Sequence, residues 1–317
     1  MSLPLAVIVP VYRRARTLQE TLQFVLAQTR LPQALVIVDD GSQDATADAA
    51  ETWLRAQNPS FDWQVVRAAH RGAAASRNTG FQAVRDLPLV SFLDSVDHWP
   101  ADFLDRACRR FETVPDTVAV SADRVFSGTG LVRLQTGLDS LPEDPPLWFI
   151  RHDAGIASCT VLARQAVEDS GGWPVHVTTG EDFLLFSAIA RLGPWRHLPG
   201  APVRFNRATE RTTGEHINLS RDQALKYREW ARQAEQLLAE VGEDDPARRE
   251  AYRKAVAARW ASAGNHFVRK RMFREARNAF QQAVALGAPP LSLRLRAAAS
   301  RVLAWMHRKS TTTHAIL

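Results

Sequence analysis

The sequence is poor in the residues that covalent or metal cross-links need. It holds two cysteines, Cys108 and Cys159, in 317 residues. Two thiols are too few for a disulfide framework or a thiolate metal cluster, which predicts a reduced, cytoplasmic setting. No apolar run approaches the roughly 20 residues that span a bilayer. The opening MSLPLAVIVPVYRR lacks a basic stretch before its short apolar run, so we expect no signal peptide.

Two kinds of glycine-rich phosphate loop are also missing. No GxGxxG follows the first apolar run, which argues against a Rossmann dinucleotide site, and no Walker loop occurs. A nucleotidyltransferase would need a loop rich in glycine and arginine after its first strand. Here Arg13, Arg14 and Arg16 supply the basic residues, but no glycine accompanies them.

Charge is spread unevenly along the chain. From residue 219 onward there are 19 Lys and Arg against 9 Asp and Glu, a net charge of +10. The whole chain carries +6, so residues 1–218 carry −4. This asymmetry indicates two parts with different roles. A basic second part suits a solvated helical surface, an anionic acceptor or a membrane surface, and we expect no nucleic acid partner.

The first part alternates buried strands with amphipathic helices. Runs rich in Val, Ile and Leu are typical of strands buried on both faces, and helical spacing of apolar residues separates them. Such alternation predicts an α/β domain with a mostly parallel central sheet. The expected strands are 4–11, 34–40, 62–68 and 89–94, and the expected helices are 16–29, 44–56 and 72–84.

Carboxylates stand where two of these strands end. Asp39 and Asp40 close the second strand, and Asp94 closes the fourth. Ligands of open parallel sheets bind beyond the carboxyl ends of the strands. We therefore expect these acids to converge at one edge of the sheet.

The pattern changes to Ala- and Arg-rich helices late in the chain. We predict two domains, residues 1–215 and 216–317. Within 257–290, large and small apolar residues follow the spacing of a 34-residue tetratricopeptide repeat. One repeat cannot bury its own face, so helices at 220–241 and 291–307 should stack on it. The repeat positions are Trp260, Gly264, Phe267, Ala276, Phe280 and Ala283.

Five short blocks lie at the ends of the expected strands and helices: IVPVYRR, VIVDDGSQDAT, RGAAASRNTGFQAV, FLDSVDHWP, and GGWP followed by GEDFLL. In this order they resemble the family 2 inverting glycosyltransferases of the GT-A fold. Any one block is a weak signal, but the resemblance that all five carry in order extends over about two thirds of the chain. One departure is Arg13, which replaces the family's usual Asn after Tyr12.

The resemblance implies a nucleotide-diphospho-sugar donor, with UDP the expected nucleotide. Pro10 and Tyr12 lie in the nucleotide loop, where Tyr12 would pack on the base and Asp40 would accept from a base N–H. A turn or helix cap is the structural alternative for Asp40. Arg77 would face the diphosphate, with a surface arginine as its alternative. Asp94 would contact the ribose or a metal.

The metal-binding block departs from the family pattern. The family's strand ends Asp-x-Asp-Asp, but the third of these positions is Val96 here. A valine cannot ligate the Mg²⁺ or Mn²⁺ that the resemblance implies. Either Asp94 and Asp97 share the metal through a shifted loop, which we favour, or metal binding is weak or lost.

The catalytic block begins with Glu181 and Asp182. In the family, the aspartate of this pair removes the proton of the acceptor hydroxyl, which implies that Asp182 is the general base and Glu181 its neighbour. The structural alternative is that both acids stabilise the first turn of a helix.

We therefore expect a cytoplasmic glycosyltransferase that acts on a glycan, lipid-linked or peptide acceptor in cell-surface polysaccharide biosynthesis. The helical tail would form a homodimer, bind a partner protein or contact the inner membrane face. The alternative is a catalytically impaired nucleotide-binding scaffold, for which Val96 is the main indication.

Overall fold

The computed structural model describes residues 3–84, 86–126, 132–133, 144–152, 157–177, 179–205 and 223–288. Contacts divide the chain into two compact units. The first comprises Met1–Pro145 and Ala154–Ile217, and the second comprises Pro146–Asp153 and Asn218–Leu317.

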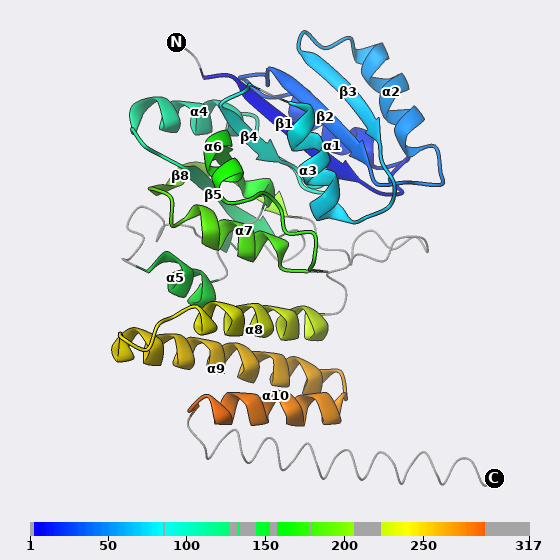
Figure 1. Ribbon diagram of the computed structural model, residues 1–317. Helices are drawn as coiled ribbons and strands as arrows, with labels where there is room; N and C mark the ends of the chain where they lie inside the picture. The colour runs from blue at the N-terminus through cyan, green and yellow to red at the C-terminus, as the bar shows by residue number, and fades with distance from the viewer. Residues whose placement is uncertain are drawn as a thin grey trace, which may run out of the picture. The chain divides into compact units, whose positions relative to one another are not determined.

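One eight-stranded sheet forms the centre of the first unit (Figure 1). Its order is β3-β2-β1-β4-β7-β5-β6, and β8 pairs with β5. The pairs β1–β2, β2–β3, β1–β4 and β5–β8 are parallel, whereas β7 and β6 run antiparallel to their neighbours. The strands are β1 Leu5–Val11, β2 Ala34–Asp39, β3 Asp62–Arg67, β4 Leu89–Phe92, β5 Ala119–Phe126, β6 Val132–Arg133, β7 Thr160–Ala163 and β8 Trp195–Phe205.

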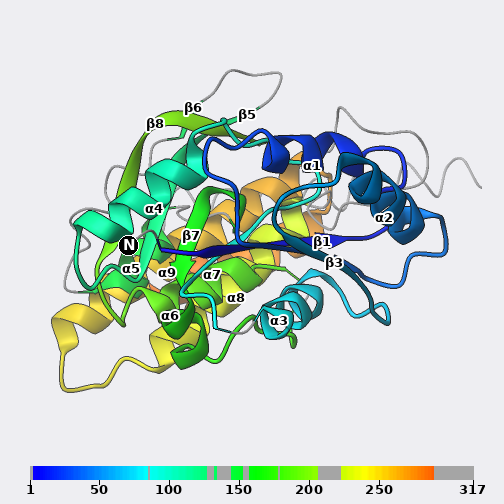
Figure 2. The ribbon, with the colours of Figure 1, turned by 90° about the horizontal axis from the view of Figure 1, so that it is seen from above.

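Helices cover both faces of this sheet. Side chains along β1 point alternately to opposite faces, and all seven of its residues are buried, so both faces need a covering layer. Val7 and Val9 belong to a core shared with α1, α2 and α4, while Ile8 on the opposite face meets α3 at Gly80. In Figure 2, α1, α2 and α4 lie on one side of β1, and α3 and α6 lie on the other. The helices are α1 Leu18–Leu26, α2 Thr46–Gln57, α3 Ala73–Ala83, α4 Phe103–Thr113, α6 Arg164–Asp169 and α7 Glu181–Ile189.

The register of the sheet brings several polar segments to one edge. Val11 pairs with Asp39, so β1 and β2 end side by side. Residue Phe92, the last of β4, pairs with Ile8 on the other side of β1. Because β7 runs antiparallel to β4, its first residues lie at this same edge. The backbone therefore places the ends of β2 and β4, after which the acids Asp40 and Asp94 follow, at the same edge of the sheet.

The second unit is helical. It contains α5 Pro145–Arg151 apart from its first residue, together with α8 Gln223–Ala239, α9 Pro246–Arg269 and α10 Phe273–Ala285. Gly264 of α9 packs so closely on Phe280 of α10 that a Cβ there would lie 2.5 Å from Phe280 Cε1. The helix expected at 220–241 is present as α8, whereas the one expected at 291–307 lies outside the described residues, and the tetratricopeptide assignment stays a prediction. In the part of the chain that the structure describes, no helix has the length and apolar character of a membrane span.

Candidate functional site

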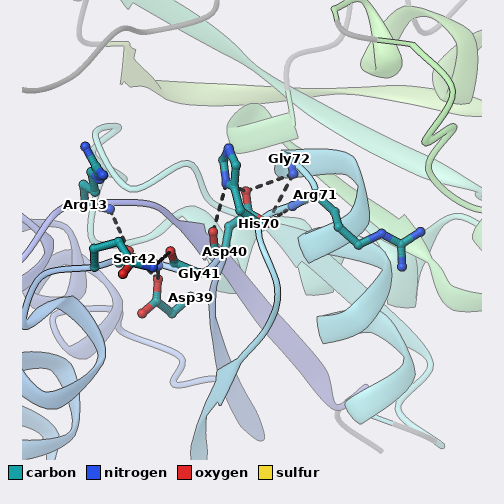
Figure 3. A network of polar contacts seen from close by, with 9 residues as sticks. Arg13, Asp39, Asp40, Gly41, Ser42, His70, Arg71 and Gly72 are labelled. Carbon is teal, nitrogen blue, oxygen red and sulfur yellow. Dashed lines mark hydrogen bonds and ion pairs between the residues drawn. The ribbon is translucent and has the colours of Figure 1, made fainter.

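The loops after β2 and β3 are tied together by the carboxylate of Asp40 (Figure 3). Asp40 is buried. Its Oδ1 accepts from the backbone N–H of Arg71 at 2.8 Å, and its Oδ2 accepts from that of Gly72 at 2.9 Å. Nδ1 of His70 lies 2.8 Å from Oδ2. The side chain predicted to contact the base therefore also fixes the loop that leads into α3.

Tyr12 joins this network through its ring. It stacks on His70 with ring centroids 4.3 Å apart. The neighbouring Arg13 has a φ of +51°, a left-handed conformation that is costly for arginine. Its N–H donates to Ser42 Oγ at 2.8 Å, which fixes the turn. Pro10, by contrast, is buried inside β1, where it pairs with Val38.

A second cluster centres on Arg77 of α3. One terminal nitrogen of its guanidinium donates to Asp94 Oδ1 at 2.7 Å, and the other donates to Glu181 Oε1 at 2.9 Å. The guanidinium carbon lies 4.3 Å from the centre of the Trp173 ring. A single arginine thus joins the segment after β4, the turn that follows α6 and the start of α7.

The side chain of Arg77 stays protonated although it is buried. Its side chain is only 5% exposed. Burial by itself lowers the pKa of Arg77, but the negative charges of Asp94 and Glu181 and their hydrogen bonds outweigh it and raise the pKa above its usual value. The guanidinium is therefore a permanent buried cation between two carboxylates.

Asp97 lies in the interior, and its N–H donates to the carbonyl of Asp94 at 3.0 Å. It is fully buried, and its Oδ2 accepts from Ser158 Oγ at 2.7 Å. The same Ser158 oxygen accepts from the backbone N–H of Asp94 at 3.1 Å, and the Ser158 carbonyl accepts from Trp99 Nε1 at 2.7 Å. Ser158 thus organises the loop after β4, although no sequence pattern singled it out.

These donors do not fit a Mg²⁺ or Mn²⁺ ion. The Val96 side chain has no oxygen to offer, Asp97 is buried against Ser158, and Asp94 already pairs with Arg77. Among the described residues, no three His, Cys, Asp or Glu side chains are grouped so that they could hold a metal. Hard cations of this kind need several oxygen ligands. The carboxylates of Asp94 and Asp97 have different partners, Arg77 and Ser158, and a metal shared between them stays a prediction.

Asp182 lies in the first turn of α7, next to Glu181. Its Oδ1 accepts from the N–H of Phe183 at 2.8 Å, a local contact at the helix start. Gly180 precedes the helix with a φ of +81°, a value suited to glycine. Because Glu181 is anchored by Arg77, the position of the Asp182 backbone relative to Asp94 is fixed as well.

The structure brings the predicted residues into two clusters. Tyr12 and Asp40 meet through His70, and Arg77, Asp94 and Glu181 meet directly. His70 could not be predicted as a site residue, because no local pattern in the sequence distinguishes it. The same holds for Asn78, whose side chain exchanges two hydrogen bonds with the backbone of Trp173 at 2.8 and 2.9 Å.

Comparison with known proteins supports one family. The family model for glycosyl transferase family 2 matches residues 6–171. An uncharacterized glycosyltransferase of Nostoc sp., alr2836, is 37% identical over 116 residues, which are 37% of this chain and 35% of that protein. This chain therefore spans about a third of that relative's length.

Two solved structures share the fold. S. aureus TarS 1–349 in complex with UDP-GlcNAc superimposes with a TM-score of 0.65 at 16% identity, covering 97% of this chain and 92% of that one. The mannosyltransferase PcManGT from Pyrobaculum calidifontis, in complex with GDP-Man and Mn²⁺, gives 0.56 at 22% identity, covering 99% and 85%. The predicted GT-A fold, with its mostly parallel sheet and a C-terminal helical region, is confirmed.

Proposed function

Because this chain belongs to glycosyl transferase family 2, we propose that it is an inverting glycosyltransferase. It takes a nucleotide-diphospho-sugar, with UDP the expected nucleotide, and transfers the sugar to a hydroxyl group of a glycan, lipid-linked or peptide acceptor. The observation that carries the proposal is the Arg77 cluster, which joins the acid after β4 to the acid pair of α7 at the ligand-binding edge of the sheet.

The nucleotide would lie over the first cluster. TarS has been solved with UDP and with UDP-GlcNAc, and PcManGT with GDP-Man. Their shared fold supports a nucleotide sugar as the donor here. Tyr12 offers a ring for base stacking, and Asp40, although it anchors two backbone N–H groups, retains lone pairs for a base N–H.

Chemistry would take place beside α7. Asp182 removes the proton of the acceptor hydroxyl, and the acceptor oxygen forms a bond to the anomeric carbon. The bond from that carbon to the diphosphate oxygen breaks on the opposite face, and its electron pair leaves with the nucleoside diphosphate. A carboxylate base contributes roughly 10²–10⁴-fold to such a step.

The test is turnover of a panel of UDP- and GDP-sugars by wild-type protein and by Asp182→Asn. We expect slow hydrolysis of one donor by the wild type, and a loss of about 10²-fold or more in the variant. The melting temperature should stay nearly unchanged, because a first-turn acid contributes about 1 kcal/mol or less. A variant that melts lower but turns over normally would assign Asp182 to helix stabilisation instead.

A second candidate is a nucleotide-binding scaffold without catalysis, which the poor metal-ligand set around Val96 favours. Calorimetry with UDP separates the two functions when it is combined with the donor panel. Binding of UDP without turnover of any sugar nucleotide would favour the scaffold, and turnover would exclude it.

A further inference from the structure

Arg77 stands where two carboxylates from distant parts of the chain would otherwise repel one another. Asp94 follows β4, and Glu181 begins α7. Their side chains are 32% and 20% exposed, whereas that of Arg77 is 5% exposed. Like charges this close to one partner would spread apart if the guanidinium were absent.

Three features keep Arg77 in this place. Its backbone belongs to α3, which packs tightly on β1 through Gly80. Its guanidinium lies over the Trp173 ring, and that ring packs edge-on against Phe92 with centroids 4.9 Å apart. Asn78, the next residue, holds the Trp173 backbone through two hydrogen bonds. The arginine is therefore part of a rigid support, and its planar guanidinium donates one hydrogen bond to each of two carboxylates.

A divalent cation between two acids would perform the same task. It would neutralise both carboxylates and hold their oxygens at a fixed separation. We propose that Arg77 is a positioning residue that takes the place of a divalent metal between Asp94 and Glu181, so that these acids do not bind a metal while the arginine is present. Val96 and Asp97 fit a metal poorly, and on this proposal no metal is needed there, because the guanidinium of Arg77 already supplies a positive charge.

The role of Arg77 in turnover rests on the proposed glycosyltransferase function. Arg77 ties the donor-side acid to α7, and α7 carries the proposed base. The arginine would act through Glu181 and Asp94 without touching the reacting atoms. Its removal should lower turnover more than it weakens donor binding, the opposite of what direct contact with the diphosphate predicts.

The experiment measures thermal stability of nucleotide-free protein with and without millimolar MnCl₂. Wild-type protein should shift by less than about 1 °C, because its acids are already neutralised. Arg77→Gln should melt lower without metal, and Mn²⁺ should raise its melting temperature by at least about 3 °C, since the freed carboxylates can bind the ion. The double variant Arg77→Gln with Asp94→Asn should lose this response.

Arg164 provides a matched control. It is also a shielded arginine over an aromatic ring, 4.2 Å from the centre of Phe81, and it pairs with a single acid, Glu168, at 2.8 Å. Arg164→Gln should lower the melting temperature with no response to Mn²⁺. A general effect of manganese on destabilised variants would appear there too and would overturn the proposal.

Two further results would overturn it. One is a wild-type protein that Mn²⁺ stabilises as much as it stabilises Arg77→Gln, and the other is an Arg77→Gln protein that Mn²⁺ does not stabilise. If Arg77→Gln does not fold, Mn²⁺ is titrated into nucleotide-free wild-type protein in a calorimeter. Binding of Mn²⁺ would contradict the proposal, and no binding would support it.

None of these measurements needs a sugar nucleotide, so they are independent of the donor-panel test of the function.

Discussion

Asp40 shows how one side chain can serve both structure and ligand binding. Its carboxylate accepts from the N–H groups of Arg71 and Gly72, so Asp40→Ala leaves both donors without this partner. We expect a loss of about 1–3 kcal/mol in the free energy of unfolding, measured by urea denaturation. Asp40→Asn retains an oxygen acceptor and should lose less.

The same pair of variants separates the two roles of Asp40. If the carboxylate contacts the base, Asp40→Asn should bind UDP more weakly in calorimetry than its small loss of stability would suggest. Equal UDP affinity in Asp40→Asn and wild-type protein would leave Asp40 a purely structural residue.

The role of Arg77 could not be predicted from its own surroundings. The sequence left two alternatives, contact with a diphosphate or exposure on the surface. Its partners Asp94 and Glu181 are 17 and 104 positions away. Such pairing depends on tertiary packing, and no helical or strand periodicity reports it. For the same reason Asp97 looked like a ligand or a cap, whereas the fold buries it against Ser158.

At the scale of whole elements, the first strands and helices were predictable because each has one plain pattern. β1 and β2 are runs of apolar, mainly β-branched or leucine residues, and both are buried almost throughout. The elements α4 and β5 were not predicted from the sequence. The strand β5 carries Asp123 and Arg124 in its interior, which hides its apolar alternation. The helix α4 does show helical spacing in its buried residues Phe103, Leu104, Ala107 and Cys108, so the sequence carries a signal for it.

The helices α8 and α9 meet at a pair of rings that should make stability depend on pH. His266 of α9 stacks on Tyr227 of α8 with centroids 4.0 Å apart. Burial, together with the charges of Arg269 and Lys270, lowers the pKa of His266 below its usual 6.5. The unfolded chain therefore binds this proton more readily than the folded one. Neutral His266 therefore adds to the free energy of unfolding. This contribution is complete above pH 6.5 and is lost as the pH falls from 6.5 through the lower pKa of the folded state.

Melting followed by circular dichroism at pH 7.5 and 5.5 tests this contribution. His266→Phe keeps an aromatic ring but cannot be protonated, so its melting temperature should fall less than that of wild-type protein between these values. His152, which stacks on Trp148 with centroids 4.6 Å apart, allows the matched change His152→Phe. An equal effect of both variants would contradict a specific contribution from His266.

Across the whole molecule, the chain crosses between its two units three times, because Pro146–Asp153 belongs to the second unit although the first unit surrounds it in sequence. Phe149 and Ile150 in this segment are buried, and their carbonyls accept from Arg259 of α9. A chain ending at residue 217 would lose this partner while keeping both apolar side chains. We therefore expect it to bind a hydrophobic dye and to associate in gel filtration, because newly exposed apolar surface favours association. The same truncation with Phe149→Gln and Ile150→Gln should be more soluble. If the plain truncation stays monomeric and binds no dye, the inserted segment does not depend on the helical unit for its burial.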